Sequence, residues 1–235
     1  MLMLPRYWLS RAATVNLAIT AHVSQRHKLP RTSVAYYGIE DLLKNSVAPR
    51  NSPRLCFAYL GRFVSEKGIP ILLKATKILR DEGHDFEVRL IGDGPERANL
   101  EEIIRRENLG SAVSITGFLT GEALPKAMLD VRVVVMPSVW EETAGLSAIE
   151  QMMRGRLVIA SAIGGLQEVV NGAGLQFIPR SAESLADCMR SVILNPSLID
   201  SFGQKARARA LDLFQRQRMI EDHAQFYRAV SVEKR

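Results

Sequence analysis

The sequence predicts an α/β fold in which helices cover both faces of a doubly wound parallel sheet. Three observations favour this fold. From residue 53 onward, short β-rich runs alternate with segments of helical apolar spacing. Each run is followed by glycine, proline or serine, and hydrophobic residues make up 47% of the 235-residue chain, enough for a sizeable core. No internal repeat or low-complexity tract points to another architecture.

The predicted strands are five short apolar runs in this part of the chain. They span residues 55–60, 86–91, 113–116, 131–136 and 157–161. Helical spacing follows the first two, with apolar residues at Ile71, Leu72, Ala75, Ile78 and Leu79 and then at Leu100, Ile103 and Ile104. A later amphipathic helix is predicted over 186–193, and an apolar helical pattern continues over 211–226. This order of elements is typical of parallel βα units.

Residues 1–52 have a different character. They contain a helix-like opening, two candidate strands at 15–20 and 33–37, and a polar stretch that runs to Pro53. Two strands with so little around them cannot form a core of their own. We therefore interpret residues 1–52 as the remnant of a preceding α/β domain, followed by a linker.

Composition excludes several classes of protein. The longest apolar run near the start, 12–21, is about half of what a bilayer span requires, and the first residues lack the pattern of a secretory signal. We therefore expect a cytoplasmic protein. Two cysteines and four histidines show no spacing typical of a disulfide framework or a zinc site, so no metal is expected.

The net charge of +6 is compatible with nucleic acid, an anionic membrane face or a phosphate-rich substrate, and does not choose among them. The basic residues are spread along the chain, with one modest cluster over 205–218. We interpret this cluster as a solvated helix face in preference to a lipid-binding patch. No nucleic-acid motif accompanies the charge.

In open parallel sheets, ligands bind outside the carboxyl ends of the strands. The residues just after each predicted strand are therefore the candidates for function. After the first strand, Gly61 allows a turn, and the cations Arg62 and Lys67 follow. The planar guanidinium of Arg62 could donate two hydrogen bonds to a diphosphate, and Lys67 could neutralise the charge of a leaving phosphate. Taken alone, the two cations are better explained by solvation or by a salt bridge to Glu66.

The next two strand ends are rich in glycine. Gly92 and Gly94 after the second strand allow a close approach of backbone to a ligand, although the loop is not a dinucleotide-binding fingerprint and alone indicates a tight turn. After the third strand come Gly117, Phe118 and Leu119. They could contact the planar base of a nucleotide, or they could only pack against neighbouring residues of the fold.

The strongest candidate pair of functional residues follows the fourth strand. Glu142 lies on a loop and Glu150 inside the following helix, with seven residues between them. Either acid could instead interact with the helix dipole. The turn through 144–146, which is Ala144, Gly145 and Leu146, presents amides at a helix N-terminus, where anions bind. After the fifth strand, Glu168 follows a Gly-Gly turn. This acid could belong to the site, or it could cap the next helix.

In order and spacing these motifs resemble those of retaining glycosyltransferases of family 4, the group 1 glycosyltransferases. The motifs that carry the resemblance are Gly61-Arg62…Glu66-Lys67-Gly68, Gly92-Asp-Gly-Pro95, Thr116-Gly117-Phe118, Pro137-Ser138…Glu142-x7-Glu150 and Gly164-Gly165…Glu168. The family has the GT-B fold, so the resemblance implies a Rossmann-like donor domain over 53–215, a C-terminal crossing helix over 216–235, and an acceptor-domain remnant over 1–52. One departure concerns residue 144, commonly phenylalanine in the family and alanine here.

The resemblance also implies roles for individual residues. Arg62 and Lys67 would hold the diphosphate, Glu150 the ribose hydroxyls, and Glu142 the transferred sugar, while the amides of 144–146 would meet phosphate or sugar. The glycines and Phe118 and Leu119 named above would complete the donor site. Transfer would retain anomeric configuration and need neither a metal nor another cofactor, because the two cations do the electrophilic work.

The resemblance implies a nucleotide sugar as donor and a glycan or lipid-linked acceptor, with peripheral membrane contact as one option. Because the bulk of the acceptor domain is missing from the chain, we expect a truncated enzyme, possible pairing with an acceptor-domain chain, or self-association. A non-catalytic subunit that binds nucleotide sugar is the alternative.

Overall fold

The structure, a computed structural model, describes residues 3–42 and 54–232. Its centre is a six-stranded, wholly parallel sheet in the order β5-β4-β3-β6-β7-β8. The strands are β3 (Cys56–Leu60), β4 (Glu87–Ile91), β5 (Val113–Gly117), β6 (Val133–Met136), β7 (Leu157–Ser161) and β8 (Leu175–Phe177). The predicted α/β class with a doubly wound parallel sheet is confirmed.

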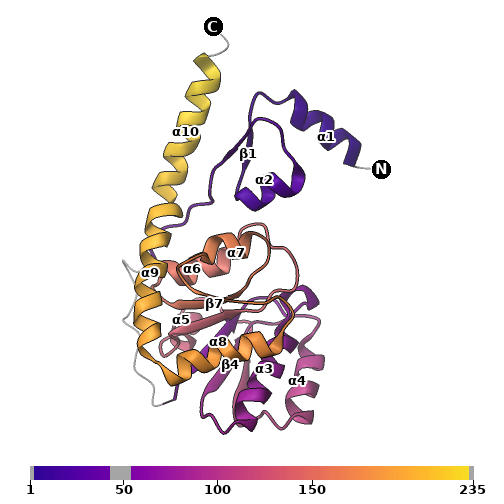
Figure 1. Ribbon diagram of the computed structural model, residues 1–235, viewed down its shortest axis with the longest axis vertical. Coiled ribbons are helices and arrows are strands. Elements are labelled where there is room, and N and C mark those ends of the chain that lie inside the picture. Colours follow the sequence, from indigo (N-terminus) through magenta and orange to yellow (C-terminus); the bar gives the residue numbers. More distant parts are fainter. Residues whose placement is uncertain (1–2, 43–53, 233–235) are drawn as a thin grey trace.

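Helices cover both faces of this sheet (Figure 1). One face carries α3 (Ile69–Asp81), α4 (Arg97–Arg106) and α8 (Ala182–Leu194). The other carries α5 (Ala123–Ala127), α6 (Leu146–Met153), α7 (Gly164–Val170) and the second half of α9 (Ser197–Leu213), whose first half contacts the core of the first face through Ile199 and Phe202. The alternation of side chains along a strand explains the two layers, since Phe57 and Tyr59 of β3 enter one core and Cys56 and Ala58 enter the other.

The five predicted strands lie within two residues of the observed ones. The sixth strand, β8, was missed because only three residues pair with β7, too few to give a pattern, and its central residue is Gln176. The short helices α5 and α7 were also missed, since five and seven residues provide little apolar periodicity.

The N-terminal segment forms a separate small unit. It consists of α1 (Met3–Ala12), β1 (Asn16–Ala18), α2 (Ala21–His27) and β2 (Thr32–Val34), and β1 pairs in parallel with β2. Figure 1 shows this unit beside the main domain, with α2 facing α7. The two predicted strands of this segment are therefore present, and within the described part of the chain they pair only with each other.

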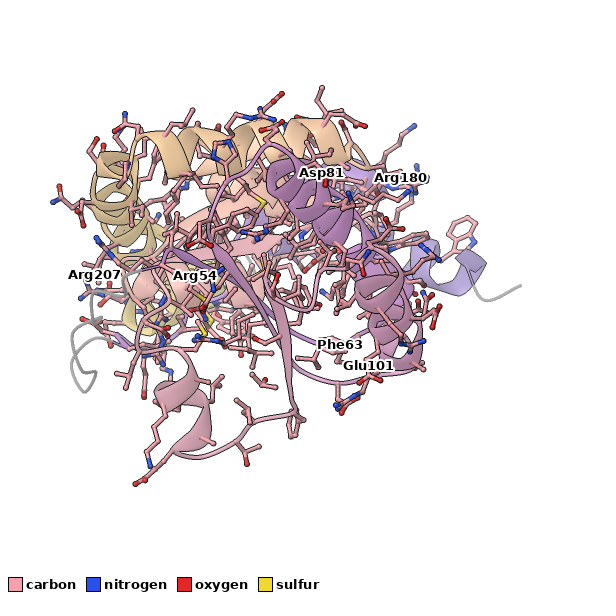
Figure 2. The ribbon with its side chains drawn as sticks, turned by 90° about the horizontal axis from the view of Figure 1, so that it is seen from below. Arg54, Phe63, Asp81, Glu101, Arg180 and Arg207 are labelled. Atoms are coloured by element: carbon pink, nitrogen blue, oxygen red, sulfur yellow. The ribbon has the colours of Figure 1, made fainter. Side chains whose placement is uncertain are left out.

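The chain after β2 meets the C-terminal helices. The backbone of Ile39 is bonded on both sides, accepting from the amide of Arg216 and donating to the carbonyl of Phe214 at 2.8 Å each. Arg207 on α9, labelled in Figure 2, binds both carboxylate oxygens of Asp41 at 2.9 Å. The last helix, α10 (Arg216–Val232), extends from this junction past the N-terminal unit (Figure 1).

The N-terminal unit, the segment that follows it and α10 expose large apolar side chains. The exposed residues include Trp8, Leu9, Ile19, Val34, Tyr37, Ile220 and Tyr227. Self-association through this surface stays a prediction. Within residues 3–42 and 54–232, no helix combines the length and apolar character that crossing a membrane requires.

Candidate functional site

The candidate site lies at the carboxyl ends of β3 and β6, which are neighbours in the middle of the sheet. The chain order of the strands reverses between these two strands, and such a switch point opens a crevice between the loops that follow them. The loop after β3 contains Gly61 and the short 3-10 helix η1 (Ser65–Lys67), and the loop after β6 leads into α6.

The two loops pack directly against each other. The amide of Val139 donates to the carbonyl of Glu66 at 2.9 Å. A Cβ atom at Gly68 would lie 2.1 Å from the carbonyl oxygen of Pro137, so only glycine permits this approach. The close contact brings the side chain of Lys67 to the residues that follow β6.

Lys67 and Glu142 form an ion pair across the two loops, with 3.0 Å between Nζ and Oε1. Both side chains are partly shielded, with exposed fractions of 33% and 21%. The hydroxyl of Ser138 donates to the same carboxylate oxygen of Glu142. Lys67 therefore pairs with Glu142 and not with its sequence neighbour Glu66, the partner considered from the sequence.

A pocket of about 260 Å³ contains this ion pair. Its lining comes from β3, β6, their loops, α6 and α7 and consists of Tyr59, Leu60, Gly61, Arg62, Lys67, Met136, Ser138, Glu142, Gly145, Ser147, Ala148 and Leu166. Five predicted site residues are thus brought together here, namely Gly61, Arg62, Lys67, Glu142 and Gly145.

Arg62 is exposed at this pocket, and its guanidinium has no hydrogen-bond or ion-pair partner in the described part of the chain. Its backbone is fixed, because the hydroxyl of Tyr59 donates to the carbonyl of Arg62 at 2.8 Å. Burial, followed by the nearby Glu142 carboxylate, raises the pKa of Tyr59, so this hydroxyl stays protonated and keeps its role as donor. A fixed backbone with a free cationic side chain suits the binding of an anion.

The start of α6 faces the same pocket. Gly145 adopts a left-handed conformation with φ of 59° just before the helix, and no side chain caps the first amides. Uncapped amides and the helix dipole together attract negative charge. Of the predicted turn, Gly145 lines the pocket, Ala144 is buried and Leu146 is exposed.

Glu150 occupies the second turn of α6 and does not line this pocket. Its carboxylate is partly buried and accepts no hydrogen bond from the described residues. Burial raises the pKa of Glu150, and the charge of Arg154 opposes this shift. A desolvated acceptor without a donor is available to hydroxyl groups of a ligand.

The remaining predicted residues form a neighbouring row at the ends of β4 and β5. The amide of Gly92 donates to the carbonyl of Gly117 at 3.0 Å, which joins the two loops. Gly94, Gly117, Phe118 and Leu119 are not part of the pocket lining, and the Phe118 side chain is 77% exposed. Of the predicted donor-binding residues, the structure therefore places Gly61 and Gly145 in the pocket around Lys67 and leaves this neighbouring row outside its lining.

The sequence interpretation missed several pocket residues, among them Tyr59, Ser138 and Leu166. Ser138 stood in the recognised Pro137-Ser138 motif, but nothing in that dipeptide indicates a bond to Glu142 four residues later. Glu168, considered either as a site residue or as a helix cap, lies inside α7 and outside the lining of this pocket, and its side chain binds the start of α2.

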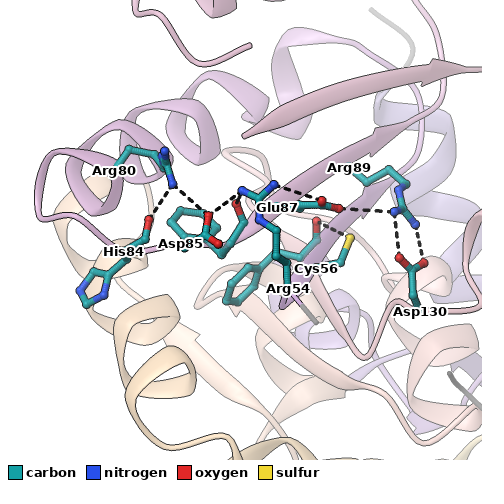
Figure 3. A network of polar contacts seen from close by, with 10 residues as sticks. Arg54, Cys56, Arg80, His84, Asp85, Glu87, Arg89 and Asp130 are labelled. Atoms are coloured by element: carbon teal, nitrogen blue, oxygen red, sulfur yellow. Dashed lines mark hydrogen bonds and ion pairs between the residues drawn. The ribbon is translucent and has the colours of Figure 1, made fainter. Parts of the chain in front are cut away.

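Among residues 3–42 and 54–232, one group of potential metal ligands is found, at the amino ends of β3 and β4, opposite the candidate site. Cys56, Glu87 and Asp130 place ligand atoms within 4.8 Å of one another. The guanidinium of Arg89 already binds Asp130 at 2.6 and 3.0 Å and approaches Glu87 at 3.7 Å (Figure 3). A protein cation thus occupies this cluster, and the arrangement is best explained as a structural ion-pair network at the amino ends of the strands.

The protein belongs to a family defined by sequence. Residues 42–209 match the model of the family described as glycosyl transferases group 1, so the chain is a member of that family. This range includes every predicted site residue, from Gly61 to Glu150.

Two curated relatives illustrate the similarity. A 2-deoxystreptamine glucosyltransferase of Streptomyces kanamyceticus is 33% identical over 169 residues, which cover 71% of this chain and 43% of the relative. A glycogen synthase of Mycobacterium tuberculosis is 30% identical over 189 residues, which cover 80% of this chain and 45% of the relative. The chain thus spans less than half the length of these relatives.

Solved structures agree with the fold. A sucrose-phosphate synthase of Thermosynechococcus elongatus superposes with a TM-score of 0.80 at 25% identity, covering 97% of this chain and 62% of that one. The Anabaena protein HepE, solved with UDP and glucose, superposes with a TM-score of 0.76 at 21% identity, covering 97% of this chain and 66% of that one.

Proposed function

We propose that this chain carries the donor-binding half of a glycosyltransferase, which moves a sugar from a nucleoside diphosphate sugar to an acceptor hydroxyl. The observation that supports the proposal most strongly is the Lys67–Glu142 pair in a pocket that also presents the unpaired cation Arg62 and the open start of α6. Cations and uncapped amides suit a diphosphate, and a carboxylate suits sugar hydroxyls.

In the proposed reaction, Arg62 and Lys67 hold the diphosphate and stabilise the charge that develops on it as the bond to the sugar breaks. The first amides of α6 add a fixed positive potential. Glu142 accepts a hydrogen bond from the sugar beside the reacting carbon, and Glu150 binds the ribose hydroxyls. No nucleophilic side chain is assigned. The acceptor hydroxyl therefore enters on the face that the diphosphate leaves, and its proton passes to the departing diphosphate.

We further propose that transfer is independent of metal and retains anomeric configuration. The two protein cations supply the charge that a divalent ion would otherwise contribute. Retention follows from departure of the diphosphate and entry of the acceptor on one face of an oxocarbenium-like centre. The donor is proposed to carry a hexose, with a glycan or a lipid-linked hydroxyl as acceptor. Among the neighbours, HepE was solved with UDP, which makes uridine nucleotides the first donors to test.

A second candidate is a subunit that binds nucleotide sugar without catalysis and pairs with a separate acceptor domain. The apolar surface over the N-terminal unit and α10 favours such a partner. Activity in the purified chain would contradict this candidate.

Calorimetric titration of the chain with UDP, GDP and ADP in the presence of EDTA tests the main proposal. We expect saturable binding of one nucleoside diphosphate without metal. Binding that appears only after Mg²⁺ is added would contradict metal independence, and no binding of any nucleotide would contradict the donor-domain assignment.

A further inference from the structure

The first turn of α2 is held by the side chain of Glu168 on α7. The amides of Ala21 and His22 donate to its two carboxylate oxygens at 2.9 and 2.8 Å. The hydroxyl of Tyr36 donates to Oε1 of the same carboxylate at 2.8 Å. One acid therefore receives three hydrogen bonds, two from α2 and one from the segment that follows β2, an arrangement that fixes α2 on the main domain.

The same end of α2 is bonded to the loop that carries Glu142. Thr20, which is fully buried, caps α2 by accepting from the amide of Val23, and its hydroxyl donates to the carbonyl of Thr143 at 2.8 Å. Beside it, Glu141 binds Arg26 of α2 at 2.9 Å. These contacts join α2 to residues on either side of Glu142.

The other side of this loop rests on α7. The carbonyl of Glu142 accepts from the amide of Gly165 at 2.7 Å. A Cβ atom at Gly165 would lie 2.2 Å from the carbonyl oxygen of Thr143, so the two backbones are in direct contact. The backbone of Glu142 and Thr143 is consequently held between α2 and α7, while the Glu142 side chain reaches Lys67 in the pocket.

We propose that Thr20 and Glu168 are positioning residues for the donor site: together they hold α2 against the loop 141–143 and so place the Glu142 carboxylate toward the transferred sugar. This inference rests on the proposed function, because it assumes that Glu142 contacts the sugar. Neither residue lines the pocket around Lys67. Both act through the backbone of the loop, and the N-terminal unit thereby contributes to a site formed by the main domain.

The test compares Thr20→Val, Thr20→Ser and Glu168→Gln with the parent chain. Valine keeps the shape of threonine but removes the hydroxyl, serine restores the hydroxyl, and glutamine places an amide group against donors that need an acceptor. Gln167→Ala is the matched control, because Gln167 is an exposed neighbour on α7 whose side chain takes no part in these contacts. Circular dichroism establishes that each variant is folded.

Two measurements follow. Amide hydrogen exchange at Gly165 reports the bond to Glu142 and needs no ligand. The ratio of the affinities for the nucleotide sugar and for the corresponding nucleoside diphosphate reports contact with the sugar. We expect Thr20→Val and Glu168→Gln to raise exchange at Gly165 by about tenfold and to reduce the affinity ratio by about fivefold to tenfold, with binding of the nucleoside diphosphate nearly unchanged. Thr20→Ser and Gln167→Ala should behave like the parent.

Unchanged exchange at Gly165 in both Thr20→Val and Glu168→Gln would overturn the proposal, as would a loss of nucleoside diphosphate affinity equal to the loss for the nucleotide sugar, since that pattern indicates a general structural role. If the parent binds no nucleotide, the proposed function fails, and the exchange measurement still decides whether these residues hold the loop.

Discussion

Lys67 and Glu142, which follow two different strands, are joined by a contact of 3.0 Å between Nζ and Oε1. The carboxylate occupies the position next to the lysine that an anionic ligand would seek. Both side chains retain some exposure, so the pair is screened by solvent and its net contribution is small. A diphosphate can therefore compete with Glu142 for Lys67 at low cost.

Replacing either cation should weaken binding of a nucleoside diphosphate. A charge-assisted hydrogen bond contributes about 1.5 to 3 kcal/mol, so Arg62→Ala and Lys67→Ala should each reduce affinity by roughly 10- to 150-fold. Calorimetry with the preferred nucleotide and with its nucleoside separates the phosphate contribution from that of the base. Lys74→Ala is the control, because it removes one positive charge from an exposed position on α3 that does not line the donor pocket. Equal losses in Lys74→Ala and Lys67→Ala would show that the effect comes from net charge alone.

Removing the carboxylate of Glu142 should have the opposite effect on the nucleotide. In Glu142→Gln, Lys67 is released from its ion pair, and we expect affinity for the nucleoside diphosphate to rise about twofold to fivefold, the size typical of a partly exposed ion pair. The additional affinity that the attached sugar provides should fall, since a hydrogen-bond acceptor of full charge is lost. Calorimetric titrations of one protein preparation with the nucleoside diphosphate and with the nucleotide sugar measure the two affinities. Weaker binding of the free nucleotide in this variant would mean that Glu142 supports the phosphate site and does not compete with it.

The close approach of the loops after β3 and β4 gives a prediction about folding. Gly92 has φ of +144°, and a Cβ atom there would lie 1.9 Å from the carbonyl oxygen of Gly61. Gly92→Ala must displace the backbone of the loops after β3 and β4. We therefore expect the free energy of unfolding to fall by on the order of 3 kcal/mol, which lowers Tm by roughly 6 to 12 °C. Gly110→Ala, where the added Cβ meets nothing within 4 Å, should shift Tm by no more than about 2 °C. Thermal unfolding followed by circular dichroism compares the two, and equal midpoints would contradict the steric argument.

The sheet could be predicted from the sequence because its strands are nearly pure apolar runs separated by glycine-rich turns. Val133 to Met136 and Leu157 to Ser161, for instance, are buried throughout, and such continuous apolar runs are typical of central strands in a parallel sheet. The three-residue β8 lies below the length at which such a pattern can be recognised. The family resemblance likewise predicted Lys67 and Glu142 as site residues, and the structure brings these two side chains together in one pocket.

The partners of these residues could not be predicted. Lys67 meets Glu142 only because Gly68 allows one loop to approach Pro137 of the other, a contact between segments far apart in the sequence. Glu168 followed a glycine turn and was considered as a cap of the nearest helix, whereas the fold presents it to the start of α2. Local patterns predict elements, but ion pairs between loops depend on how those elements pack.

The last prediction concerns the cost of keeping Glu150 charged inside α6. Burial raises the pKa of this carboxyl above the ordinary value of 4.5, so the folded state binds its proton more tightly than the unfolded state does. The charged carboxylate therefore lowers the free energy of unfolding of the parent at neutral pH. This loss of stability becomes smaller as pH falls through the pKa of the folded state. Glu150→Gln, which carries no charge, should be more stable than the parent at pH 7.5 by on the order of 1 kcal/mol, or roughly 2 to 4 °C in Tm.

This advantage of Glu150→Gln should shrink on acidification and vanish below about pH 4.5, where the carboxyl is protonated in both states. The same variant should bind the nucleotide more weakly, because the amide is a poorer acceptor for ribose hydroxyls. Arg154→Ala provides an internal check: the positive charge of Arg154 opposes the raised pKa, so its removal should enlarge the penalty and lower Tm at pH 7.5. A parent and a Glu150→Gln variant with the same Tm from pH 4 to pH 8 would show that burial does not disfavour this charge, and the stability of the fold would then not oppose its use as a ligand-binding group.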